Sequence, residues 1–99
     1  MITEVAQIEI KPGLEAEFEA AIVKAPALFE RSKGCRSMEV RRSIEKRNCY
    51  RLFISWDTIE DHTVHFRNST ESQELRTLIG HFFASPPEVE HFEQVVQGF

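Results

Sequence analysis

Residues 35–56 read CRSMEVRRSIEKRNCYRLFISW, with a polar turn, Glu45-Lys46-Arg47, between two strand-like segments. In the second segment, residues 48–56, the side chains alternate as in a strand with one buried face. The apolar series is Tyr50, Leu52, Ile54 and Trp56, and the opposite series is Cys49, Arg51, Phe53 and Ser55. The first segment, residues 35–44, is so near along the chain that we expect the two to pair as an antiparallel hairpin.

A strand and a helix are expected before this hairpin. Residues 2–10 alternate, with one apolar side made of Ile2, Glu4, Ala6, Ile8 and Ile10. Lys11-Pro12-Gly13 then breaks the strand. Apolar residues next recur in steps of three and four, which predicts one amphipathic helix with this stripe: Leu14, Phe18, Ala21, Ile22, Ala25, Leu28 and Phe29. Pro26 predicts a kink or a tightened last turn in that helix, and Gly34 supplies its stop.

Two helices and a last strand are expected after the hairpin. Asp57 or Thr58 caps the first helix, since each has an acid three positions on, as in a capping box. Ile59, His62 and Phe66 share the apolar face of this helix. Ser69 or Thr70 opens the next helix, whose apolar side is Leu75, Leu78, Ile79, Phe82 and Phe83. Pro86-Pro87 ends it, and residues 89–96 make the last strand.

The expected order is therefore β-α-β-β-α-α-β, an α+β chain that forms a single domain over residues 1–99. Four strands with two helical crossovers match a ferredoxin-like antiparallel sheet with helices on one face. The other face carries Val5 and Phe53 among polar groups. A half-apolar face on so small a domain predicts that the chain pairs with a second copy, as a homodimer.

Composition excludes several classes of partner. A net charge of −4 argues against nucleic acid, which requires clustered Lys and Arg. No apolar run approaches the ~20 residues of a membrane span, and the first residues lack the pattern of a signal peptide. We therefore expect a cytoplasmic protein without membrane contact. Cys35 and Cys49 have no metal-ligand spacing and are interpreted as small, partly buried hydrophobic residues.

The chain resembles the antibiotic biosynthesis monooxygenase family. The resemblance lies in Gly34-Cys35 before the hairpin, then Phe53-Ile54-Ser55-Trp56-Asp57, Glu60-Asp61-His62, Phe66 and Ser69, with Lys11-Pro12-Gly13 ahead of the first helix. It implies a dimeric α+β barrel with a pocket between sheet and helices in each subunit. It also implies, as one activity among several, oxygenation of quinols and polycyclic phenols without metal, flavin or haem.

His62 is the candidate catalytic base, because an imidazole accepts a phenolic proton near neutral pH. The alternative is a core histidine that is hydrogen-bonded to main chain or to a neighbouring side chain. Trp56, Tyr50 and Phe66 are the candidate substrate-binding residues, with Trp56 as a stacking wall and Tyr50 as a hydrogen-bond donor in the same pocket. The alternative for these aromatic residues is plain core packing.

We expect no metal and no cofactor. His62 and His65 lie three residues apart, but a metal needs a further converging ligand, and His81 and His91 stand on other elements. The haem-degrading members of the family use an Asn, a Trp and a His at positions that align with Ala6, His65 and Leu75. This sequence departs from the pattern at all three positions.

The sequence thus predicts a cofactor-independent monooxygenase that acts on a small aromatic, quinol-type substrate. One alternative is a module that binds a small apolar or aromatic ligand without converting it. The other is a structural dimer with a vestigial pocket. A pocket with one polar group at its end favours the enzyme, whereas a filled core with His62 bonded to main chain favours the structural dimer.

Overall fold

Four antiparallel strands form one sheet in the order β2-β3-β1-β4. The computed structural model describes residues 1–99. The strands are β1 (Ile2–Glu9), β2 (Cys35–Arg42), β3 (Cys49–Trp56) and β4 (Glu88–Phe92). β2 and β3 pair as the hairpin that the sequence predicts, and β1 lies between β3 and β4. The ferredoxin-like arrangement of an antiparallel sheet with helices is confirmed.

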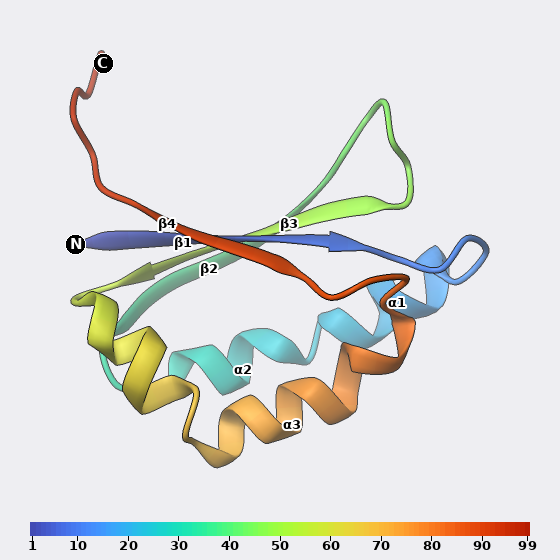
Figure 1. Cartoon of the computed structure of the whole chain (residues 1–99), viewed down its shortest axis with the longest axis horizontal. Helices are drawn as coiled ribbons and strands as arrows, with labels where there is room; N and C mark the ends of the chain where they lie inside the picture. Colours follow the sequence, from blue (N-terminus) through green and yellow to red (C-terminus); the bar gives the residue numbers. More distant parts are fainter.

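The helices all lie on one face of the sheet, and the opposite face is open (Figure 1). They are α1 (Glu15–Ile22), α2 (Ala25–Glu30), the π-helix η1 (Asp61–Phe66), α3 (Thr70–Ile79) and the short 3₁₀-helix η2 (Gly80–Phe82). No helix has the length and apolar character that crossing a membrane requires. Sheet and helices therefore make two layers with the core between them.

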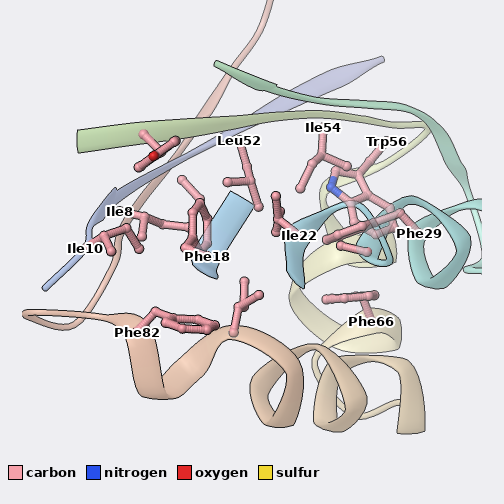
Figure 2. Close-up of a cluster of buried hydrophobic side chains, with 14 residues drawn as sticks. Ile8, Ile10, Phe18, Ile22, Phe29, Leu52, Ile54, Trp56, Phe66 and Phe82 are labelled. Carbon is pink, nitrogen blue, oxygen red and sulfur yellow. The ribbon is translucent and has the colours of Figure 1, made fainter. Parts of the chain in front are cut away.

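The core has two ends along the sheet. Phe18, Ile8 and Phe82 fill one end, and Trp56, Phe29 and Phe66 fill the other (Figure 2). At the second end the rings of Phe29 and Phe66 stack with centroids 5.0 Å apart, and those of Trp56 and Phe66 lie 5.4 Å apart. Trp56 is the last inward residue of β3 and is fully buried, with the rings of Phe29 on α2 and of His62 and Phe66 on η1 packed against it.

The single helix that was predicted after the first strand is two helices. α1 ends at Ile22, and α2 starts at Ala25, so that Pro26 falls in the first turn of α2 rather than late in a longer helix. The first turn of a helix has free N–H groups, so proline loses no hydrogen bond there, whereas within a helix it removes one. The break keeps Phe18 and Phe29 on the same buried face.

The helix after β3 begins as predicted but winds differently. Thr58 and Asp61 form the capping box: the Asp61 N–H donates to Oγ1 of Thr58 and the Thr58 N–H donates to Oδ2 of Asp61, each at 3.2 Å. The following turns are π-helical, with a wider turn than an α-helix. The α-helical phase assumed for the apolar face is therefore wrong at Ile59, which is 39% exposed, while His62 and Phe66 are buried.

The last strand is shorter than predicted. β4 ends at Phe92, whereas the sequence pattern continued to residue 96. Phe92 lies opposite Thr3, and β1 itself begins at Ile2, so the chain beyond Phe92 runs past the end of its partner strand. Residues 93–99 leave the sheet and extend away from the helices (Figure 1).

Candidate functional site

Four polar or aromatic side chains from four elements meet in one buried network. Oε1 of Glu4 accepts a hydrogen bond from the Trp56 indole N–H at 3.0 Å, and it lies 3.3 Å from Nε2 of His62. Nδ1 of His62 lies 2.7 Å from Nε2 of His91. Glu4 and His62 are each 5% exposed, and His91 is half-buried. We call these four residues the Glu4 network.

Strand register brings three of its members together. Glu4 on β1 lies directly opposite His91 on β4 and opposite Ile54 on β3. Residues two apart on a strand share a face, so Trp56 is the diagonal neighbour of Glu4 on the helix-covered side. A carboxylate on an otherwise apolar strand face thus acquires a donor on one side and an imidazole on the other.

The fourth member, His62, is held by η1. The capping box of Thr58 and Asp61 fixes the start of η1, and His62 follows at once. Its ring stacks on the Trp56 indole with centroids 5.5 Å apart and an angle of 20° between the planes. Phe66, about one π-helical turn further along η1, packs against the His62 ring from the core side. His62 is therefore fixed by stacking as well as by its hydrogen bond with His91 and its contact with Glu4.

Burial moves the pKa values of the two central groups in opposite directions. Burial raises the pKa of Glu4 to about 7, although the Trp56 hydrogen bond and the Arg67 charge oppose the rise. Burial lowers the pKa of His62 to about 4, and the nearby charges of Arg67 and His91 add to the effect. The pKa of His91 is lowered by burial and by Arg67 as well.

Glu4 and His62 are accordingly in close contact but do not form an ion pair. Their 3.3 Å separation would suit a salt bridge, but burial raises the pKa of Glu4 and lowers that of His62, which favours the uncharged form of each group. An imidazolium buried in this position would lack water, which disfavours the ion pair in spite of the short distance. Near neutral pH, His62 is uncharged, and the Glu4 carboxyl group gains or loses its proton.

The hydrogen bonds permit two neutral arrangements of the histidine protons. With Glu4 ionised, the His62 Nε2–H faces the carboxylate oxygen 3.3 Å away, and the His91 Nε2–H donates to Nδ1 of His62. With Glu4 protonated, each donor becomes an acceptor, and both histidines carry the proton on Nδ1. The network is thus a path along which a proton can move between Glu4 and His91.

The structure brings three of the four predicted site residues together and separates the fourth. Trp56, His62 and Phe66 are in mutual contact. The prediction that Tyr50 donates into the same pocket is wrong, because its hydroxyl donates to Oε2 of Glu19 on α1 at 2.5 Å. Six residues along a strand span about 20 Å, so Tyr50 lies at the other end of the core. Burial, with Glu19, raises the pKa of Tyr50 to about 12.

Sequence reasoning missed Glu4 and His91 as members of the site. The available signal was Glu4 itself, the one charged residue on the apolar side of the first strand. A buried carboxylate is unfavourable unless it is paired, so that position pointed to a partner. His91 carried no such signal, because only the β1–β4 register places it opposite Glu4.

The pair of histidines considered for a metal, His62 and His65, does not converge. His65 is exposed, with its Nε2 3.5 Å from Nζ of Lys33, whereas His62 is buried. No group of three or more His, Cys, Asp or Glu side chains is arranged to hold a metal ion.

Comparison with known proteins agrees with this fold and with the resemblance in sequence. The uncharacterized protein YczJ of Bacillus subtilis strain 168 is 40% identical over 95 residues, 96% of this chain and 100% of that protein. A crystal structure of a Bordetella bronchiseptica member of the family has a TM-score of 0.93 at 44% identity, covering 96% of this chain and 97% of that one. Rv0793 from Mycobacterium tuberculosis shares the fold, with a TM-score of 0.78 at 17% identity over 99% of this chain and 98% of that one.

The sequence profile of one family, antibiotic biosynthesis monooxygenase, matches residues 1–78, which is most of the chain. The two relatives at 40% and 44% identity each cover 96% of the chain. The chain belongs to the antibiotic biosynthesis monooxygenase family.

Proposed function

We propose that this protein is a cofactor-independent monooxygenase acting on a quinol or another small phenol. The reaction takes two hydrogens from the substrate and one oxygen atom from O₂, so that SH₂ + O₂ gives SO + H₂O. The observation that supports it is the buried Glu4–His62 pair beside Trp56. Deprotonation makes a phenol electron-rich enough to react with O₂, and the pair is the chain's means of deprotonation.

The proton affinity of the pair suits this task. A general base acts best when its pKa is close to the working pH, and that of Glu4 is about 7. His62 alone, with a pKa of about 4, is too weak a base for a phenol at neutral pH. In the proposal His62 therefore accepts a proton only as it gives its own proton to Glu4.

Packing around the pair supports a functional role over a purely structural one. A buried carboxylate is costly, and an apolar residue of similar size at Glu4 would avoid that cost. Strongly shifted pKa values that arise from burial gather at functional sites. Trp56 and Phe66 hold the His62 ring, and the Arg67 charge nearby favours an anionic substrate once the proton has left.

We also propose that the open face of the sheet is covered by a second copy of the chain. Val5 and Phe53 are half-buried there, and Phe92 is 49% exposed. The face is hollowed around these residues, and the guanidinium of Arg41 lies over the Phe53 ring at 4.7 Å from its centroid. A second identical face would cover this apolar surface and add to the small core of one chain.

A second candidate function is a structural or ligand-binding dimer without turnover. It is favoured by the dense filling of the space between sheet and helices, where Phe18 and Trp56 are 0% exposed and Phe29 is 2% exposed. Under this alternative the Glu4 network fixes the end of the sheet to η1. The ring nitrogens of His62 contact the side chains of His91 and Glu4, which also fits a core histidine held by neighbouring side chains.

Oxygen uptake by the purified protein distinguishes the two functions. We expect uptake with at least one member of a panel of quinols and polycyclic phenols, and a fall of about 10²-fold or more in His62→Ala. The matched control is His65→Ala, on the same helix but exposed, which should keep the rate of the parent protein. Uptake no faster than the protein-free blank across the panel would reject the enzyme in favour of the dimer without turnover.

A further inference from the structure

His62 is closed to a substrate in this structure. Its Nδ1 is engaged by His91, its Nε2 lies against Glu4, and its ring face is covered by Trp56. Only 5% of the residue is exposed. A phenol could reach either ring nitrogen only by breaking one of these contacts.

His91 is open where His62 is closed. It stands on β4, an edge strand of the sheet, and it is half-buried. Its Nε2 contacts His62, while its Nδ1 has no hydrogen-bond partner in the protein. No buried side-chain nitrogen or oxygen is left without a partner, so Nδ1 of His91 is accessible to solvent. The Glu4 network therefore has one end inside the core and one end at the surface.

We propose that His91 is the catalytic residue that takes the proton from the substrate hydroxyl, with His62 as the relay and Glu4 as the final acceptor. The inference rests on the proposed function, and it adds a residue and a direction to it. The substrate class is that of the proposed function, a phenol whose hydroxyl would meet Nδ1 of His91 at the β4 edge.

Each step of the transfer conserves protons and charge. The substrate O–H bond breaks and its proton binds Nδ1 of His91. The His91 Nε2–H gives its proton to Nδ1 of His62, and the His62 Nε2–H gives its proton to Oε1 of Glu4, along the 2.7 Å and 3.3 Å contacts. Both histidines end neutral with the proton on Nδ1, Glu4 ends neutral, and the one negative charge has moved to the substrate.

Few other charged or titratable groups influence this path. Arg67, at the end of η1, acts on Glu4, His62 and His91 through its positive charge. Its backbone N–H donates to the His62 carbonyl at 3.2 Å, which fixes the residue beside the network. Burial raises the pKa of the Cys35 thiol on β2, and the negative charge of Glu4 adds to the rise. The acceptor at the end of the path is therefore Glu4.

Nitrogen NMR of the histidine rings tests the relay without any turnover. As pH falls through about 7, we expect His62 and His91 to exchange the Nε2–H form for the Nδ1–H form together, with one midpoint. In Glu4→Gln, which keeps the side-chain shape, that joint step should vanish. The His65 signal, outside the network, should respond identically in both proteins. Separate midpoints for the two rings, or a joint step that persists in Glu4→Gln, would overturn the relay.

A coloured, unreactive phenol tests the role of His91. 4-Nitrophenol absorbs visible light only as its phenolate, so the bound probe reports its own deprotonation. We expect the probe to perturb the His91 ring signals first, and its deprotonation by the protein to be lost in His91→Phe and in Glu4→Gln. Deprotonation that survives in His91→Phe, or a probe that leaves the His91 signals unchanged, counts against the proposal.

The two experiments separate this inference from the proposed function. If His62 and His91 change tautomer with one midpoint but no oxygen uptake is measured, the relay is retained and the oxygenase is rejected. Oxygen uptake that requires His62, together with separate histidine midpoints, retains the oxygenase and rejects the relay.

Discussion

The indole N–H of Trp56 donates to Oε1 of Glu4 at 3.0 Å, across the neighbouring strands β3 and β1. Tyr50 also donates to a carboxylate, that of the exposed Glu19, but in the Trp56–Glu4 bond both partners are buried. The bond favours the ionised form of Glu4, against burial, which favours the protonated form. The aromatic residue thus has an electrostatic role in addition to its packing.

Trp56→Phe removes that donor and keeps an aromatic ring in the core. We expect the free energy of unfolding to fall by about 1–3 kcal/mol more at pH 8 than at pH 5, because only the ionised carboxylate needs the bond strongly. Urea unfolding at the two pH values measures the difference, and the loss of ring volume cancels in the comparison. An equal loss at both pH values would show that Trp56 acts by packing alone.

The titrations of Glu4 and His62 should become visible in the pH dependence of the free energy of unfolding when one of the two residues is replaced. The raised pKa of Glu4 lowers stability as pH rises from about 4.5 to about 7, because the unfolded chain loses the proton first. The lowered pKa of His62 does the reverse: stability is lost as pH falls from about 6.5 to about 4. In the parent protein the two effects largely cancel between pH 4.5 and 6.5.

Removal of one partner breaks this cancellation. Glu4→Gln should gain stability with rising pH across the window, and His62→Gln should lose it, each by up to about 3 kcal/mol. Chemical unfolding at half-unit pH steps checks both slopes. Parallel pH profiles for the two variants would contradict the assigned pKa directions.

Gly34→Ala should be far more harmful than Gly13→Ala. Both glycines have positive φ, +76° and +94°, so each substitution carries a backbone cost of about 1–2 kcal/mol. A Cβ at Gly34 would lie 2.0 Å from Oδ2 of the buried Asp61, whereas a Cβ at Gly13 meets open space. We expect thermal unfolding to show a clearly larger loss for Gly34→Ala. Equal losses would mean that Asp61 can move aside freely.

Phe53→Lys should disrupt the proposed homodimer. The substitution puts a charge on the half-apolar open face, where a partner would leave it without water. Sedimentation velocity at micromolar concentration should give twice the chain mass for the parent protein and the monomer mass for the variant. Val23→Lys, at a 71% exposed position between α1 and α2, is the matched control and should remain dimeric. A monomeric parent protein would reject the dimer.

Arg67→Gln should move the titration of the network upward in pH. Loss of the positive charge removes a stabiliser of ionised Glu4 and a destabiliser of protonated His62 and His91, so all three pKa values rise. Arg67→Lys keeps the charge and should change the midpoints much less. Histidine NMR titrations of the three proteins give the comparison, and a downward shift in Arg67→Gln would contradict it.

The elements that could be predicted are those that local pattern determines. Alternation marks β1 and β3, and the Thr58–Asp61 spacing marks the start of the helix after β3, because both signals lie within a few residues. The break between α1 and α2 was misjudged because Pro26 suits a first turn as well as a kink. Local sequence alone does not choose between them.

The site was less predictable because it is formed by the pairing of strands that lie far apart in the sequence. His62 and Trp56 were identifiable from their own elements, but their partners depend on register: Glu4 meets His91 only because β4 lies beside β1. Tyr50 was misplaced for the opposite reason, since it shares a strand face with Trp56 but its hydroxyl bonds to Glu19 on α1. Side chains on one face of a strand point in the same direction, but they can lie far apart along the strand.

The π-helical winding of η1 has a consequence for how the family can vary in length. The Arg67 N–H bonds to the carbonyl of His62, five residues earlier, so this turn holds one residue more than an α-helical turn. A single-residue deletion within Asp61–Phe66 would let the turn close as an α-helix and rotate His62 relative to Phe66. Insertions and deletions here are therefore not neutral changes of a connecting segment. In an alignment of relatives, a gap at this point would mark proteins whose imidazole no longer lies between the carboxylate and the edge strand.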